Sequence, residues 1–240
     1  MDLLNKLLGR HQTVSPPGGL IGYFNLSDWW LTTLSQEQRD WIERTQYGLG
    51  DQNDPRLLTS GKVEHPSLTA TNLLTKIAII LHEGGFRQQS VATFALAEAE
   101  AIRQRNFTGL HFVYHNLVEL NYRERDKAPG SLAIAIEACL KQIAIAPRAA
   151  EAFLAEHLAE QLKSDTGTIK WDRTKYPARP FYLPFAVGYY QLAIIREKEG
   201  NFSEAIRLSK QALEQGWVGH WESRIARLEK KLQKQGKKKG

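Results

Sequence analysis

The residues best placed to do chemistry are two histidines and a glutamate in a predicted helix. His111, His115 and Glu119 are spaced four positions apart, so they fall on successive turns of one helix face. Two imidazoles at this spacing can share a metal ion. No glutamate directly follows His111, however, and no distant third ligand is evident. We therefore favour packing or groove polarity, with no metal, cofactor or catalytic residue, and keep metal-dependent activity as the alternative.

A second candidate is the insert 163–184, where aromatic and basic residues alternate. Its candidate anion or nucleic-acid contacts are Lys170, Arg173, Lys175 and Arg179. Basic residues interleaved with aromatic rings can hold phosphates and stack bases. Three prolines in the insert instead favour an extended cover with its aromatic rings turned inward, lying over a helical surface. We favour the cover and keep nucleic-acid binding as the alternative.

The basic charge of the chain is concentrated at its C-terminal end. Eight basic and two acidic residues between Glu222 and Gly240 account for the whole formal net charge of +6. The rest of the chain is neutral, which excludes a protein whose entire surface is built to hold nucleic acid. The local candidates for anion contacts are Lys237, Lys238 and Lys239.

Several common signals are missing from the sequence. The single cysteine, Cys139, cannot form an intramolecular disulfide, and we find neither a signal-peptide pattern nor an apolar run of about 18 residues. These features predict a soluble, cytoplasmic protein without a membrane span. The phosphate-binding, dinucleotide-binding, serine-hydrolase and zinc-protease motifs are also absent, so we expect a protein that is not an enzyme.

The first 66 residues are predicted to form an N-terminal arm and a tryptophan-rich helical hairpin. Ser27 and Ser35 are candidate N-caps, and Gln38 completes a capping box with Ser35. The tryptophans between residues 29 and 41 should pack this hairpin on the next helices. The polar segment 47–66 is predicted to be a loop.

From residue 67 onward the hydrophobic pattern is helical, and no segment shows the alternation of a half-buried strand. The predicted helices span 73–83, 87–105, 110–125, 131–146 and 149–162, with Pro147 ending the fourth. Closely spaced alanines let helix axes approach one another. The pattern predicts an all-α fold of stacked antiparallel helical hairpins.

The clearest hairpin begins at Tyr189 and resembles a tetratricopeptide repeat (TPR). Its first helix carries Tyr189, Leu192 and Ala193, a Gly200-Asn201-Phe202 turn follows, and small residues stand at the helix crossing. Weaker copies lie between residues 77 and 97 and between 117 and 147. The resemblance implies a TPR-like repeat domain over 67–221, followed by a basic capping helix and tail over 222–240.

The resemblance also implies a concave groove lined by the first helix of each hairpin. The residues expected in this partner-binding groove are Asn72, Lys76, His115, Asn116, Glu119, Arg123, Tyr190, Ile194 and Glu197. The carboxylate clamp of some family members is not reproduced, because Val187 and Gln191 stand where cations would help. We expect an adaptor that binds a peptide or helix of another protein. The alternative is a nucleic-acid-associated factor that uses the basic tail and the insert, and the oligomeric state stays open.

Overall fold

The structure, a computed structural model, describes residues 16–45, 55–66, 68–166 and 180–237. This part of the chain is mostly helical, which confirms the predicted all-α class. The chain divides into two compact units, residues 1–90 and 91–240. The division falls within helix α6 (Arg87–Arg103), whereas the sequence suggested a boundary after residue 66.

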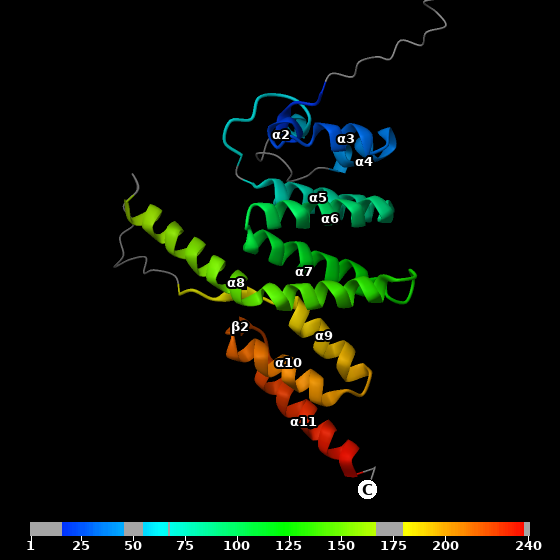
Figure 1. Cartoon of the computed structure of the whole chain (residues 1–240), viewed down its shortest axis with the longest axis vertical. Coiled ribbons are helices and arrows are strands. Elements are labelled where there is room, and N and C mark those ends of the chain that lie inside the picture. The colour runs from blue at the N-terminus through cyan, green and yellow to red at the C-terminus, as the bar shows by residue number, and fades with distance from the viewer. Residues whose placement is uncertain (1–15, 46–54, 67, 167–179, 238–240) are drawn as a thin grey trace, which may run out of the picture. The chain divides into compact units, whose positions relative to one another are not determined.

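The first unit contains the short helices α2 (Gly19–Tyr23), α3 (Ser27–Thr32) and α4 (Gln36–Thr45), the 3-10 helix η1 (Pro55–Leu58) and helix α5 (Ala70–Glu83), which are labelled in Figure 1. The predicted capping box is confirmed at the start of α4. The backbone N–H of Ser35 donates to Gln38 Oε1 at 2.9 Å, and the backbone N–H of Gln38 donates to Ser35 Oγ at 3.3 Å. These reciprocal bonds satisfy backbone donors that the first helical turn leaves without partners.

Ser27 does not cap α3, so that prediction was wrong. The helix already includes Ser27, Leu26 occupies the cap position, and the Ser27 hydroxyl lies 3.5 Å from the carbonyl oxygen of Pro17. The turn before the helix places Asn25 in the left-handed region at φ 57°. This turn brings the chain into the helix one residue earlier than the cap pattern indicates.

Trp41 packs α4 against the end of α5, as the sequence predicted. Its indole Nε1 donates to the carbonyl oxygen of Ile80 at 2.9 Å. A Cβ atom at Gly84 would lie only 2.4 Å from that nitrogen. The contact therefore requires a glycine at position 84.

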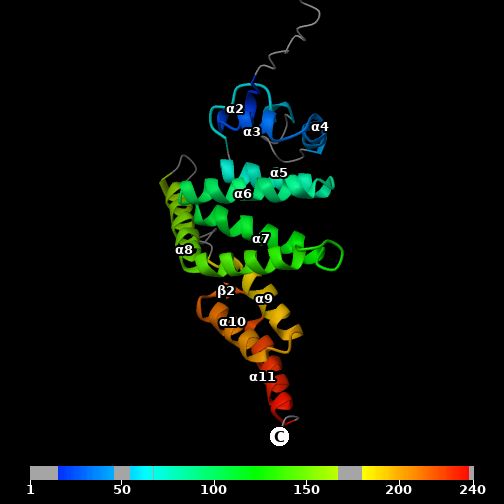
Figure 2. The same cartoon turned by 45° about the vertical axis from the view of Figure 1, so that its right-hand side comes forward.

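The second unit contains the rest of α6, helices α7 (Phe107–Arg123), α8 (Ser131–Thr166), α9 (Val187–Lys198), α10 (Phe202–Glu214) and α11 (Trp221–Lys237), and strands β1 (Leu183–Phe185) and β2 (Trp217–Val218). From α7 onward each helix packs on the next one along the chain. Figure 2 shows this succession from α7 to α11.

The predicted helix end at Pro147 was wrong, because helix α8 continues through it. It is one helix of 36 residues with Pro147 inside it, where the sequence suggested two. A proline inside a helix lacks a backbone donor and bends the axis, and Figure 1 shows α8 as two arms that meet at a bend. Ala146 and Ala149 are buried on either side of the exposed proline. The packed neighbours hold the helix together across the missing hydrogen bond.

The two short strands also contradict the prediction from the sequence, which included no strand. Strand β1 pairs with β2 in parallel, with Leu183 opposite Trp217 and Phe185 opposite Val218. The pairing joins the chain just before α9 to the chain just after α10. Strands of three and two residues are too short to show an alternating pattern.

The hairpin α9–α10 agrees with the predicted turn and packing positions. Gly200 adopts the left-handed conformation at φ 76°, and the side chain of Asn201 accepts the backbone N–H of Glu204 at 3.2 Å, capping α10. The predicted large and small residues of the hairpin are all buried: Tyr189, Leu192, Ala193, Ala205 and Ala212.

Candidate functional site

His111 of α7 lies in an aromatic cluster in the second unit. Its ring is fully buried and stacks on Trp217, with centroids 5.2 Å apart and an interplanar angle of 6°. The rings of Phe112 and Phe153 meet it edge-on, each 5.3 Å away. Neither ring nitrogen makes a hydrogen bond of ordinary geometry with a described residue. This environment resembles a packed core more than a ligand site.

Burial keeps His111 neutral. Loss of hydration, assisted by the nearby His115, lowers the pKa of His111 to about 4. Burial also lowers the pKa of His115, and the carboxylate of Glu119 opposes that shift. The His115 Nε2 to Glu119 Oε2 distance is 3.8 Å, which is beyond hydrogen-bonding range.

The three residues first considered for metal binding do not form a ligand set. The rings of His111 and His115 are 6.5 Å apart, and His111 is enclosed by aromatic side chains. Among the residues that the structure describes, no group of three His, Cys, Asp or Glu side chains could hold a metal ion. The aromatic rings around His111 make this part of α7 a packed core.

The other predicted groove residues of α7 face solvent to different degrees. Glu119 and Arg123 are exposed, whereas Asn116 is half-buried and donates from Nδ2 to the carbonyl oxygen of Phe112 at 2.7 Å. In the first unit, Asn72 and Lys76 are exposed on α5. The backbone N–H of Asn72 donates to the capping Thr69.

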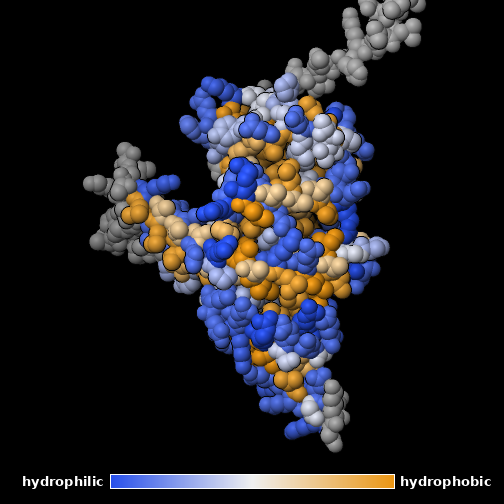
Figure 3. Space-filling model, in the orientation of Figure 1, coloured by the Kyte–Doolittle hydropathy of each residue, from blue (hydrophilic) through white to orange (hydrophobic). Residues whose placement is uncertain are grey.

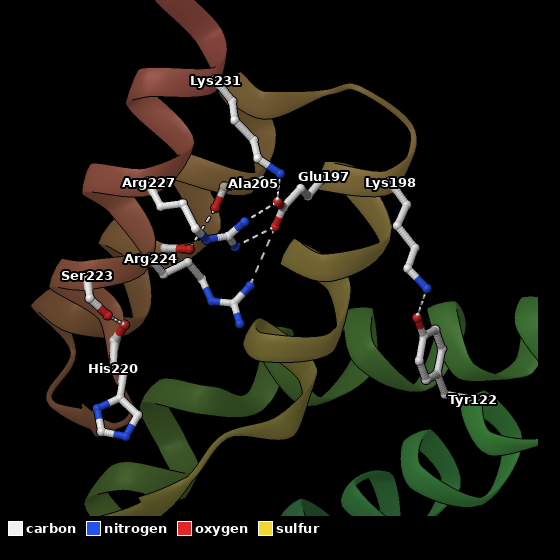
Figure 4. A network of polar contacts seen from close by, with 10 residues as sticks. Tyr122, Glu197, Lys198, Ala205, His220, Ser223, Arg224, Arg227 and Lys231 are labelled. Atoms are coloured by element: carbon white, nitrogen blue, oxygen red, sulfur yellow. Dashed lines mark hydrogen bonds and ion pairs between the residues drawn. The ribbon is translucent and has the colours of Figure 1, made fainter.

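On α9, Glu197 is engaged by three cations from α11 (Figure 4). Arg227 holds its carboxylate with both terminal nitrogens, one of them 2.7 Å from Oε2, and Lys231 donates to Oε1 at 2.7 Å. Arg224 approaches Oε2 at 4.0 Å. The hydrogen bonds from Arg227, followed by those from Lys231, lower the pKa of Glu197 to about 2.

Arg224 and Tyr190 complete this network, which we call the Glu197 cluster. The Arg224 guanidinium carbon lies 4.2 Å from the centre of the Tyr190 ring, a cation–π arrangement. Only 10% of the Arg224 side chain is exposed, and its Nη1 makes no hydrogen bond with any residue that the structure describes. Two residues predicted to line the groove, Tyr190 and Glu197, thus contact the chain's own α11, while Ile194 between them is half-buried.

The sequence reasoning missed an exposed apolar face on α8. Leu154, Leu158 and Leu162 are 42%, 49% and 64% exposed, and Ala155 and Ala159 beside them are exposed too. Figure 3 shows hydrophobic residues along this outer part of α8. The spacing of the leucines by four was visible in the sequence, but their exposure depends on which face of α8 the other helices cover.

The remaining residues predicted to contact an anion or nucleic acid lie at the end of a described segment or outside the described residues. Lys237 is the last residue of α11. Four insert residues and two tail residues lie outside the described residues: Lys170, Arg173, Lys175, Arg179, Lys238 and Lys239. The N-terminal arm, residues 1–10, also lies outside them.

The first unit holds a pocket that contains none of the predicted site residues. It has a volume of about 240 Å³, and its walls come from Leu20 and from the segment between Leu57 and Leu68. Lys62 and Glu64 in that wall form an ion pair at 2.7 Å and are mostly exposed. A pair of this kind is largely hydrated and gives the pocket little electrostatic character.

Comparison of the chain with protein-family models, with curated proteins and with solved structures returned no match. No helix in the described part of the chain is both long and apolar enough to cross a membrane. The candidate sites therefore rest on their own geometry.

Proposed function

We propose that the protein is a non-enzymatic adaptor with TPR-like hairpins that binds a helix or peptide of another protein. The α9–α10 hairpin supports the TPR-like architecture, because its large and small residues occupy the buried positions that the family pattern requires. The pairing of Leu183 with Trp217 adds support. These residues are 34 positions apart, and 34 residues is the repeat length of the family.

The observation that carries the binding proposal is the exposed face of α8. We call Leu154, Leu158 and Leu162 the leucine seam. Residues four apart on a helix are neighbours separated by about 6 Å along the axis, so the seam is a continuous apolar strip. Burying a whole leucine contributes about 1.5–3 kcal/mol. Covering the exposed part of several leucines would therefore give a partner a useful anchor.

The kind of partner follows from the shape of the seam. The exposed alanines Ala155 and Ala159 allow a second helix to approach closely. An amphipathic helix presents apolar side chains at three- and four-residue spacing and matches such a strip. We therefore propose that the partner contributes an amphipathic helix.

The predicted groove offers a weaker anchor than the seam. Glu119 and Arg123 are exposed and polar, and exposed charges contribute little affinity by themselves. Tyr190 and Glu197 already contact α11. In this proposal the α7 residues tune partner choice, and the leucine seam supplies most of the affinity.

Affinity capture with defined variants tests the proposal. Leu154→Asp with Leu158→Asp should reduce recovery of partner proteins at least tenfold, because two charges would have to be buried in the contact. Leu213→Asp is the matched control, since Leu213 is an exposed leucine of α10 with 37% exposure. It should leave recovery unchanged.

A second variant separates the seam from the groove. Glu119→Lys with Arg123→Glu reverses both exposed charges of α7 and should change which partners are recovered without removing all of them. If only this variant abolishes recovery, the groove is the main site and the seam assignment is wrong. If neither variant changes the partners, the adaptor proposal fails.

A further inference from the structure

Helix α11 carries two sets of cations with different surroundings. The inner set, Arg224, Arg227 and Lys231, surrounds the carboxylate of Glu197. The outer set consists of Lys230, Lys234 and Lys237, which we call the lysine row. All three are exposed, and none forms an ion pair with a described residue. The chain thus uses one set internally and leaves the other facing solvent.

The lysine row lies along one face of the helix. Spacings of four and three residues place the three side chains on adjoining turns, about 10 Å from first to last along the axis. Of the two glutamates in α11, Glu229 turns toward α10, where it pairs with Lys210 at 3.1 Å. Glu222 lies two turns before the row. Within α11, the face of the row therefore carries positive charge without a neutralising carboxylate.

The helix that carries the row is held firmly in place. Trp221 and Leu228 on its inner face are buried, and the Glu197 cluster ties its middle to α9. Gln235 near its end donates to the carbonyl oxygen of Gly200 at 3.2 Å. A charged surface held in a fixed arrangement loses less conformational freedom on binding than a flexible tail does.

We propose that the lysine row binds the phosphate backbone of nucleic acid without reading its sequence. Duplex DNA carries one negative charge per about 1.7 Å of its axis, so a row of about 10 Å meets several phosphates. Each lysine that neutralises a phosphate releases condensed counterions, and this release drives binding. The sequence continues past the row with Lys238 and Lys239. This inference does not depend on the adaptor function proposed above.

The chemistry of the helix favours nucleic acid over a lipid surface. Amphipathic helices that bind membranes insert bulky apolar residues between the lipids. Of the four bulky apolar residues of α11, Trp221 and Leu228 are buried and Ile225 is half-buried. Leu232 is 38% exposed, but it lies two positions from both Lys230 and Lys234 and so does not share the face of the row. Binding here depends on charge alone, and the dense, regular phosphates of a nucleic acid supply the stronger field.

The test measures binding of the full-length protein to a fluorescent 20-base-pair DNA duplex by anisotropy, from 25 to 200 mM salt. The test variant is Lys230→Gln with Lys234→Gln and Lys237→Gln. The control variant, Lys62→Gln with Lys127→Gln and Lys163→Gln, removes the same net charge from exposed positions outside α11. Circular dichroism checks that all three proteins are folded.

The expected result is a change in the salt dependence. Loss of three phosphate contacts should reduce the slope of log K against log salt by about 3, since each contact contributes about 0.9. The control should keep a slope close to that of the wild type. Equal slopes for the two variants, or no DNA binding by the wild type, would overturn the proposal.

Two further probes distinguish other anionic partners. The first probe is vesicles in which a quarter of the lipid is phosphatidylserine, and the second is a poly-glutamate peptide. Each is titrated with the protein at the same salt concentrations. We expect both to bind more weakly than DNA. Stronger binding of vesicles would assign the row to a membrane surface, and stronger binding of poly-glutamate would assign it to an acidic protein. Either result would overturn the nucleic-acid proposal.

Discussion

The aromatic cluster around His111 and the Glu197 cluster surround a polar side chain in opposite ways. His111 is fully buried, neutral, and surrounded by rings that offer its nitrogens no ordinary hydrogen bond. Glu197 is 13% exposed, charged, and contacted by three cations. The first cluster tolerates a polar group within packing, whereas the second uses one to hold two helices together.

The difference shows that a polar residue on a predicted groove face can have an internal role. The sequence pattern placed His115, one helical turn after His111, on the predicted groove lining. It placed Glu197 on the same lining. In the structure, His111 packs against residues that come later in the chain, and Glu197 binds a helix that begins 24 residues after it. The two clusters also predict separate responses to acid.

The largest expected effect is an acid-induced loss of stability caused by His111. Its folded pKa of about 4 lies below the ordinary 6.5, so its contribution is fully present above pH 6.5 and is lost as the pH falls toward 4. The loss approaches about 3 kcal/mol. Urea unfolding at intervals between pH 7.5 and 4 measures it.

His111→Phe keeps an aromatic ring and removes the titrating group. We expect the free energy of unfolding of this variant to depend much less on pH between 6.5 and 4 than that of the wild type. At pH 7.5 the two proteins should be equally stable. His220→Gln, a change at an exposed histidine, should leave the wild-type profile intact. An unchanged profile in His111→Phe would show that the buried ring does not govern this window.

The second effect, of intermediate size, belongs to Glu197. Its folded pKa is about 2, compared with an ordinary 4.5, so its contribution is present above pH 4.5 and disappears as the pH falls toward 2. At neutral pH, Glu197→Gln should cost about 1–3 kcal/mol, because charge-assisted hydrogen bonds are lost. Thermal unfolding in low and high salt measures this cost.

The salt dependence of stability should distinguish the two clusters. High salt should shrink the difference between Glu197→Gln and the wild type, because Arg227 and Lys231 are about half exposed and their attraction is screened. It should not change the effect of His111→Phe. A Glu197→Gln difference that is independent of salt would argue that packing, rather than charge, holds α11 on α9.

The smallest effect distinguishes the arginines within the Glu197 cluster. Arg224→Met should change stability by less than about 1 kcal/mol, because it loses a cation–π contact and a 4.0 Å ion pair with Glu197 but also removes a buried donor that makes no hydrogen bond with a described residue. Arg227→Met should cost more, since Arg227 holds the carboxylate with two hydrogen bonds. Equal losses in chemical unfolding would contradict this ranking.

Two local signals in the sequence predicted local structure correctly. Ser35 and Gln38 form their capping box because both partners lie within one helical turn. Gly200 and Asn201 mark the α9–α10 turn through a left-handed glycine and a side-chain cap. In both cases the residues that decide the structure lie within one helical turn of one another in the chain.

One error was local, because the turn at Asn25 starts α3 before Ser27 can cap it. The others arose where distant contacts decide the outcome. Pro147 ordinarily ends a helix, but buried alanines on both sides keep α8 continuous. The three cations around Glu197 come from α11, so helical spacing within α9 could not reveal them. The exposure of Leu158 likewise depends on which face of α8 its neighbours cover. Spacing identifies a face of a helix but not what lies against it.

The parallel pairing of Leu183 with Trp217 has a consequence for how the chain could be lengthened. It places the beginning of a 34-residue segment beside the residue that begins the next segment. A duplicated copy of residues 183–216 inserted before Trp217 would start at the same backbone position and in the same direction. In an array of repeats, stability adds through contacts between neighbours. Under the proposed TPR-like architecture, the α9–α10 segment is suited to modular extension, with α11 moved outward to close the longer array.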